Sequence, residues 1–118
     1  MKANAILDKS MDFSVKIVML YKHLVSQKGE YVLSKQLLRS GTSIGANAHE
    51  AHNGQTKKDF LAKMYIAFKE AGESEYWLKL LVRTEYLTKE QGDGMITECV
   101  EIKKILTAII KTLKSNLN

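Results

Sequence analysis

The chain has no proline among its 118 residues, and turn-favouring sequences interrupt it at three places. These are Gln27-Lys28-Gly29, Asn53-Gly54-Gln55-Thr56 and Tyr86-Leu87-Thr88. Proline is the residue that most strongly breaks an α-helix, so each of the four segments between the turns can be helical throughout.

All four segments carry apolar residues at spacings of three and four, which is the spacing of residues on one face of an α-helix. The alternation of apolar and polar residues that is typical of a strand does not persist over a comparable length. We predict helices at about 3–28, 32–53, 56–86 and 88–115. Short connections make neighbouring helices antiparallel, so residues 1–118 are predicted to form one all-α domain, an antiparallel up-down-up-down four-helix bundle. The predicted inward faces are Ile6, Ser10, Phe13, Ile17, Leu20 and Leu24; Leu33, Leu37, Ser40, Ile44, Asn47 and Ala51; Phe60, Met64, Ala67, Ala71, Ser74, Leu78 and Leu81; and Met95, Cys99, Ile102, Leu106, Ile109 and Leu113.

Several residues predict how the helices end. Thr56 suits the N-cap of the third helix, and Thr88 with Gln91 three residues later matches a capping box for the fourth. Gly29 and Gly54 suit helix C-termini, where a left-handed residue is favoured.

The second helix contains two glycines on one face, Gly41 and Gly45. Glycine in a helix interior costs about 0.5–1 kcal/mol relative to alanine, so a second role must offset that cost. We expect close packing within the bundle, with a contact between subunits as the alternative. When the inward faces are aligned, Ser10 and Asn47 should pair as buried polar groups.

Each helix also carries apolar residues outside its inward face. A small bundle needs about three apolar residues in seven, and these helices exceed that number. Exposed apolar patches usually indicate a partner, so we expect self-association. The residues concerned are Val15, Val18, Met19 and Val25 on the first helix; Leu61, Tyr65, Phe68, Trp77 and Leu80 on the third; and Ile96, Val100, Ile105 and Ile110 on the fourth.

Composition limits the cellular setting. There is one cysteine, so no intramolecular disulfide can form. No apolar run reaches the roughly 18 residues of a membrane span, and the first 30 residues do not resemble a signal peptide. We therefore expect a soluble, cytoplasmic protein.

The sequence offers little for catalysis or metal binding. His49 and His52 stand three apart around Glu50, whereas the zinc-protease motif needs two histidines four apart, so at most a weak surface metal site is expected. No Glu-x-x-His pair of the di-iron bundles occurs. No nucleophile or base accompanies the acidic run that includes Glu73, and an ion pair of Glu73 with Arg39 is the better expectation. We predict no enzyme activity, no metal and no cofactor.

The net charge of +5 leaves three sets of lysines that could contact phosphates. Ordinary solvated surface charge is the alternative for each set. The sets are Lys57, Lys58 and Lys63 at the start of the third helix, with His52 nearby; Lys103, Lys104, Lys111 and Lys114 on the fourth helix; and Lys2, Lys9 and Lys16 at seven-residue intervals on the first.

Two stretches, EYVLSKQLLRSGTSIGANAHEA and KKDFLAKMYIAFKEAGESEYWLKLL, resemble the intervening-sequence proteins encoded within bacterial 23S ribosomal RNA genes. The resemblance covers about residues 7–113. It implies a four-helix bundle that forms homopentamers, and it extends to a pentameric, nucleic-acid-binding accessory protein of diversity-generating retroelements. It supplies no catalytic residues. The matched polar residues are expected to form an internal network: Arg39, Ser40, Asn47, Glu50, Glu73 and Glu75.

The first hypothesis is a non-enzymatic protein, pentameric as the resemblance implies, that binds RNA or DNA through its lysines. The second is a protein–protein adaptor that uses the extra apolar faces and does not bind nucleic acid. The third, an enzyme or metal protein, is the weakest because no catalytic constellation is present. No membrane association is expected under any of the three.

Overall fold

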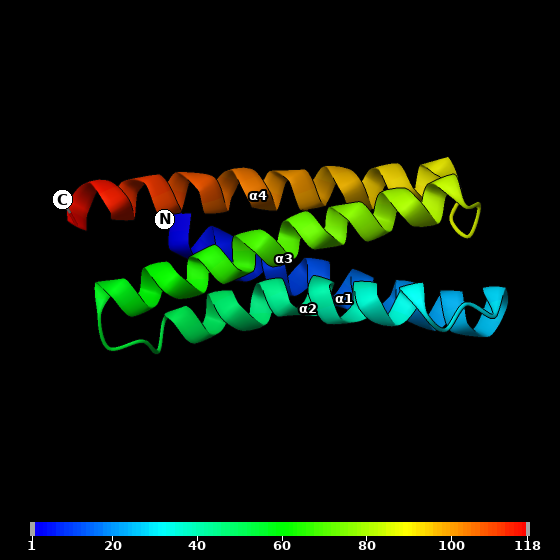
Figure 1. Cartoon of the computed structure of the whole chain (residues 1–118), viewed down its shortest axis with the longest axis horizontal. Helices are drawn as coiled ribbons and strands as arrows, with labels where there is room; N and C mark the ends of the chain where they lie inside the picture. The colour runs from blue at the N-terminus through cyan, green and yellow to red at the C-terminus, as the bar shows by residue number, and fades with distance from the viewer. Residues whose placement is uncertain (1, 118) are drawn as a thin grey trace.

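A computed structural model of the chain describes the backbone of residues 2–117 and the side chains of residues 5–116. It contains four helices: α1 (Lys2–Lys28), α2 (Leu33–Ala51), α3 (Lys57–Arg83) and α4 (Lys89–Leu117). No strand occurs in the described residues. Successive helices run in opposite directions along a rod of 48 × 21 × 20 Å (Figure 1). The predicted all-α, up-and-down four-helix bundle is confirmed, and the helix ends lie within three residues of their predicted positions.

The predicted inward faces form the core. Large side chains such as Phe13, Ile44 and Leu106 are completely shielded from solvent. Leu20, Leu33, Asn47, Phe60 and Leu113 are half-buried at the edge of the core. The buried face of α2 is wider than predicted, because small residues next to the predicted face are also enclosed. These additional buried residues are Ser34, Gly41, Gly45 and Ala48.

The two glycines of α2 allow α1 to approach closely. A Cβ atom added to Gly41 would lie 2.8 Å from Cγ1 of Ile17, and one added to Gly45 would lie 3.3 Å from the Ser10 carbonyl oxygen. Real Cβ atoms essentially never come as near as the first of these distances. Close packing within the bundle therefore explains both glycines.

The predicted pairing of Ser10 with Asn47 is wrong. The Ser10 hydroxyl donates to the carbonyl of Leu7 at 3.2 Å, and the Asn47 side-chain amide donates to the carbonyl of Ser43 at 2.8 Å. Ser10 faces Gly45 rather than Asn47. Because each side chain finds an acceptor on its own helix, neither needs the other.

Most of the predicted helix ends are present. Thr56 accepts a hydrogen bond from the Asp59 amide at 3.0 Å, and Thr88 and Gln91 exchange the two bonds of a capping box. Gly29 has a left-handed φ of 64°. The left-handed assignment for Gly54 is wrong, since its amide instead donates to the Ala51 carbonyl in a tight turn.

The residues that cap the end of α3 and the start of α2 were not predicted. Glu85 adopts a left-handed φ of 68° after α3, and the amides of Glu85 and Tyr86 donate to the carbonyls of Val82 and Leu81. This pattern is the Schellman motif, in which glycine is the usual left-handed residue. At the start of α2, the carboxylate of Glu30 accepts from the amides of Val32, Leu33 and Ser34 at 2.6–3.1 Å.

Candidate nucleic-acid interface

Charge is strongly segregated along the α3–α4 pair. Residues 57–70 and 103–117, here called the basic half, contain eight lysines and two acidic residues. Residues 71–102, the acidic half, contain seven acidic and three basic residues. The antiparallel course brings the start of α3 beside the end of α4, so the two stretches of the basic half lie at the same end of the bundle (Figure 1). Positive charge is therefore concentrated at this end of the α3–α4 pair and negative charge over the rest of it.

The predicted lysines of the basic half differ in their availability. Five of them have exposed side chains that form no ion pair with another described residue: Lys57, Lys58, Lys104, Lys111 and Lys114. Lys63 pairs with Glu50 at 3.0 Å, and Lys103 pairs with Glu75 at 3.1 Å. Lys63 and Lys103 are therefore partly neutralised before any ligand arrives.

Two aromatic rings on α3 lie beneath lysines of α4. The Nζ atom of Lys114 is 5.6 Å from the ring centroid of Tyr65, and that of Lys103 is 5.8 Å from the centroid of Phe68. Phe68 also borders an open groove, which is lined in addition by Glu75, Val100, Lys103, Lys104 and Thr107. The sequence identified both rings only as extra apolar residues. Their spacing of three on a helix next to a lysine-rich one was the signal that could have indicated a surface site.

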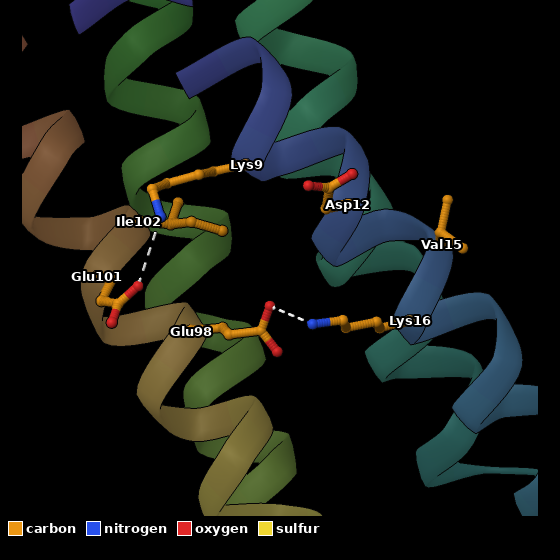
Figure 2. A pocket seen from close by; sticks show the side chains of 7 residues that line it. All are labelled: Lys9, Asp12, Val15, Lys16, Glu98, Glu101 and Ile102. Atoms are coloured by element: carbon orange, nitrogen blue, oxygen red, sulfur yellow. Dashed lines mark hydrogen bonds and ion pairs between the residues drawn. The ribbon is translucent and has the colours of Figure 1, made fainter. Parts of the chain in front are cut away.

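Lys9 and Lys16, two of the three predicted phosphate-binding lysines of α1, are already paired with carboxylates of α4. Lys9 pairs with Glu101 at 3.6 Å, and Lys16 pairs with Glu98 at 2.8 Å, across a groove between α1 and α4 that Asp12, Val15 and Ile102 also line (Figure 2). The hydrogen bond to Glu98 is the main reason that the pKa of Lys16 is raised. The side chain of Lys2 lies outside the described residues. This expected phosphate-binding set instead joins the first and last helices.

The predicted ion pair between Arg39 and Glu73 is present. The Arg39 guanidinium, on α2, binds both Glu73 and Glu70 of α3, and its nitrogen lies 2.8 Å from the Glu70 carboxylate. The indole of Trp77 also donates to Glu73, at 3.0 Å. The hydrogen bonds from Trp77 and then from Arg39 outweigh burial and lower the pKa of Glu73.

The other residues of the expected polar network do not join this cluster. Glu75 binds Lys79 and Lys103, and Glu50 binds Lys63, on different faces of α3. Ser40 faces Ser74 in the core, while Asn47 bonds within its own helix. Of the expected network, Arg39 and Glu73 are bonded to each other, whereas Ser40, Asn47, Glu50 and Glu75 bond elsewhere.

The histidine pair does not build a metal site. The His52 ring nitrogen lies 2.9 Å from the Ala48 carbonyl, and the ring meets Phe60 edge to face. Residues 5–116 contain no group of three or more histidine, cysteine or acidic side chains placed to hold a metal ion. Cys99 is buried and its thiol donates to the Ala71 carbonyl at 3.1 Å; burial raises the pKa of Cys99 to about 12. Within the described backbone, no helix combines the length and apolar character that crossing a membrane requires.

Comparison with known proteins places the chain beside a bacterial family. The family model described as "23S rRNA-intervening sequence protein" matches residues 2–108. A crystal structure of a protein of unknown function from the S23 ribosomal protein family of Bacteroides thetaiotaomicron superimposes with a TM-score of 0.93. The two sequences are 56% identical, over 94% of this chain and 99% of the other. No curated protein matches the chain.

Proposed function

Because the chain belongs to the 23S rRNA-intervening sequence protein family, and that membership assigns no activity, we propose its function from its own surface. The protein is a non-catalytic, oligomeric bundle that binds RNA or DNA through the basic half of α3 and α4. The observation that carries this proposal is the placement, at one end of the α3–α4 pair, of two stretches that together hold eight lysines and two acidic residues. Phosphate contacts made by lysines supply affinity without requiring base recognition.

Assembly is the second part of the proposal. Met11, Val15 and Met19 are 52%, 56% and 59% exposed and follow one another at intervals of four on α1. They form a continuous apolar stripe, and such a stripe on a helix is usually covered by a partner. We assign this stripe to contacts between subunits of a homopentamer, the number of subunits following from the family resemblance. Five copies would bring a formal charge of about +25 together, so that weak contacts act jointly.

A titration tests the proposal. Purified protein is added to a labelled structured RNA and to a labelled DNA duplex at about 50 mM and about 200 mM salt, and the oligomer mass is measured on the same sample. We expect a pentamer whose affinity falls steeply with salt. Absence of binding at the lower salt concentration would overturn the nucleic-acid assignment, and a monomer would overturn the assembly.

A protein–protein adaptor is the second candidate. Its support is apolar surface away from the α1 stripe, at Tyr31, Val32 and Tyr76, which are 57%, 70% and 60% exposed. This alternative predicts no salt-dependent nucleic-acid binding and co-purification with one specific protein. Substituting Val32 with lysine should then abolish co-purification without altering the oligomer mass.

A further inference from the structure

We propose that the basic half binds single-stranded nucleic acid, with unpaired bases stacking on Tyr65 and Phe68 while the lysines of α4 hold the phosphates. This inference rests on the proposed function and specifies its ligand. It starts from the two aromatic rings rather than from the charge. Tyr65 is 37% exposed and Phe68 is half-buried, and both face lysines of α4.

The spacing of the rings suits adjacent bases. Residues three apart on a helix are neighbours on its surface, and their Cα atoms are separated by a rise of about 4.5 Å along the helix. The stacking distance of bases along one strand is about 3.4 Å, so the two rings can meet successive bases of a slightly extended strand. Exposed aromatic rings combined with a basic groove are the usual platform for single strands. In a duplex the base faces are already covered by their neighbours, so only the phosphates could be contacted.

The lysines run alongside the rings on the adjacent helix. Lys104, Lys111 and Lys114 are exposed, and the first and last of them are ten residues apart, a rise of about 15 Å. At about 3.4 Å per nucleotide, that length accommodates about four nucleotides. The Nζ atoms of Lys103 and Lys114 lie 5.8 and 5.6 Å from the ring centroids of Phe68 and Tyr65. A base that stacks on either ring would displace the ammonium group to the edge of the ring, where it can meet the phosphate of that nucleotide.

Glu75 limits the site at the end that adjoins the acidic half. Its carboxylate is bound by Lys79 at 2.7 Å and by Lys103 at 3.1 Å, and it lines the same groove as Phe68. The hydrogen bond from Lys79 is the largest contribution to a lowered pKa, with Lys103 adding to it, so Glu75 stays ionised at neutral pH. The acidic half begins here and repels phosphates. The strand is therefore confined to the part of the groove that leads to the end of α4.

The chain supplies a matched control for the rings. Tyr76 also lies on α3 and is 60% exposed, but it belongs to the acidic half. Loss of a stacking ring typically weakens single-strand binding by about tenfold or more, whereas loss of a ring outside the site should have no effect. Leucine is the replacement of choice because it retains apolar volume and helix propensity.

The experiment measures the affinity of full-length protein for a labelled 12-nucleotide oligo-dT, an oligo-rU of the same length, and a hairpin duplex of equal charge. The variants are Tyr65→Leu, Tyr65→Phe, Phe68→Leu and Tyr76→Leu, with Trp77 fluorescence as the check of folding. We expect Tyr65→Leu to weaken binding of both single strands about tenfold, Tyr65→Phe and Tyr76→Leu to leave it unchanged, and the duplex to bind more weakly than either strand.

Equal affinity for duplex and single strands, or unchanged affinity in the folded Tyr65→Leu and Phe68→Leu variants, would overturn the stacking site while leaving the proposed function intact. Equally tight binding of polyglutamate would also overturn it, because an acidic chain without bases would then suffice. If the wild-type protein bound none of these nucleic acids at low salt, the proposed function itself would fail.

Discussion

The hydroxyl oxygens of Ser40 and Ser74 lie 2.9 Å apart at a fully buried contact between α2 and α3. Each hydroxyl also has a carbonyl of its own helix in reach, Leu37 at 3.4 Å for Ser40 and Glu70 at 2.8 Å for Ser74. The pair therefore forms a short polar chain across an otherwise apolar interface. Together with the Arg39 cluster on the outside of the same two helices, it specifies how α2 and α3 align.

The two serines should contribute to stability as a pair, so that the double variant loses less free energy of unfolding than the two single variants together. Ser74→Ala removes the donor to the buried Ser40 oxygen and leaves Ser40 only its long 3.4 Å bond to the Leu37 carbonyl, so we expect a loss of about 1–3 kcal/mol in the free energy of unfolding. The double variant Ser40→Ala/Ser74→Ala should lose less than the sum of the single losses, because no orphaned hydroxyl remains. Urea unfolding of the four proteins measures this coupling, and strict additivity would contradict it.

Gly41→Ala should destabilise the bundle although alanine favours helices. The added methyl group would lie 2.8 Å from Ile17, and overpacking of this kind typically costs about 1–3 kcal/mol. Gly72→Ala on α3 is the matched control, because its Cβ would meet nothing within 4 Å and the protein should gain about 0.5–1 kcal/mol. The two midpoints of urea unfolding should move in opposite directions; a shift in the same direction would show that α1 can withdraw from α2.

Glu85→Gly should stabilise the protein. Glu85 holds a left-handed φ of 68°, which costs an ordinary residue about 1–2 kcal/mol and costs glycine almost nothing. The reciprocal change, Gly29→Ala at φ 64°, should destabilise by a similar amount. Thermal unfolding followed by circular dichroism gives both values. A less stable Glu85→Gly variant would indicate that the glutamate side chain itself contributes to stability.

The stability contributed by Glu30 should depend on pH. Burial raises the pKa of Glu30, but the amides of Leu33, Ser34 and Val32 lower it by more, so the pKa lies below the usual 4.5. Since the folded-state pKa is below the unfolded one, this contribution is complete above about pH 4.5 and is lost as the pH falls through the lower value. Glu30→Gln should therefore reduce the free energy of unfolding at pH 7 by about 1 kcal/mol.

Urea unfolding between pH 7 and pH 3 checks the Glu30 prediction. The difference between wild type and Glu30→Gln should shrink toward pH 3, because protonated Glu30 resembles glutamine. A difference that stays constant over this range would mean that the charge of Glu30 does not stabilise the start of α2.

Lys57→Glu/Lys58→Glu should weaken nucleic-acid binding and reduce its salt dependence. Both side chains are exposed in the basic half, and each lost phosphate contact lowers the slope of log affinity against log salt by about 1. Lys22→Glu/Lys28→Glu changes the net charge equally near the C-terminal end of α1, at the opposite end of the bundle, and both lysines are exposed. Equal effects of the two double variants would mean that overall charge, rather than the basic half, governs binding.

The helices and their inward faces could be predicted because they depend on local periodicity. The three–four spacing is visible in the sequence, and burial follows it closely at residues such as Phe13, Ile44 and Leu78. The Arg39–Glu73 pair was also accessible, since aligning the inward faces places α2 and α3 in register. The roles of Glu85 and Glu30 at the helix ends could not be predicted. Glutamate is not a typical residue at either position, and only the path of the chain in three dimensions shows these roles.

The candidate site was only partly predictable. The sequence supplied the lysines, but it could not show that Glu50 and Glu75 neutralise Lys63 and Lys103, or that carboxylates of α4 neutralise Lys9 and Lys16. Those pairings depend on which helix faces meet across the bundle. The placement of Tyr65 under Lys114 depends in the same way on the antiparallel alignment of α3 and α4.

An even number of antiparallel helices returns the chain to the end of the bundle at which it started. α1 therefore begins, and α4 ends, at the end formed by the basic half (Figure 1). An affinity tag or fluorescent protein fused to either terminus would emerge beside the lysines, where a polyhistidine tag would add cations and an acidic tag would compete for them. The turn between α3 and α4, at Glu85 and Tyr86, lies at the opposite end and offers an attachment point for a probe that leaves the basic half clear.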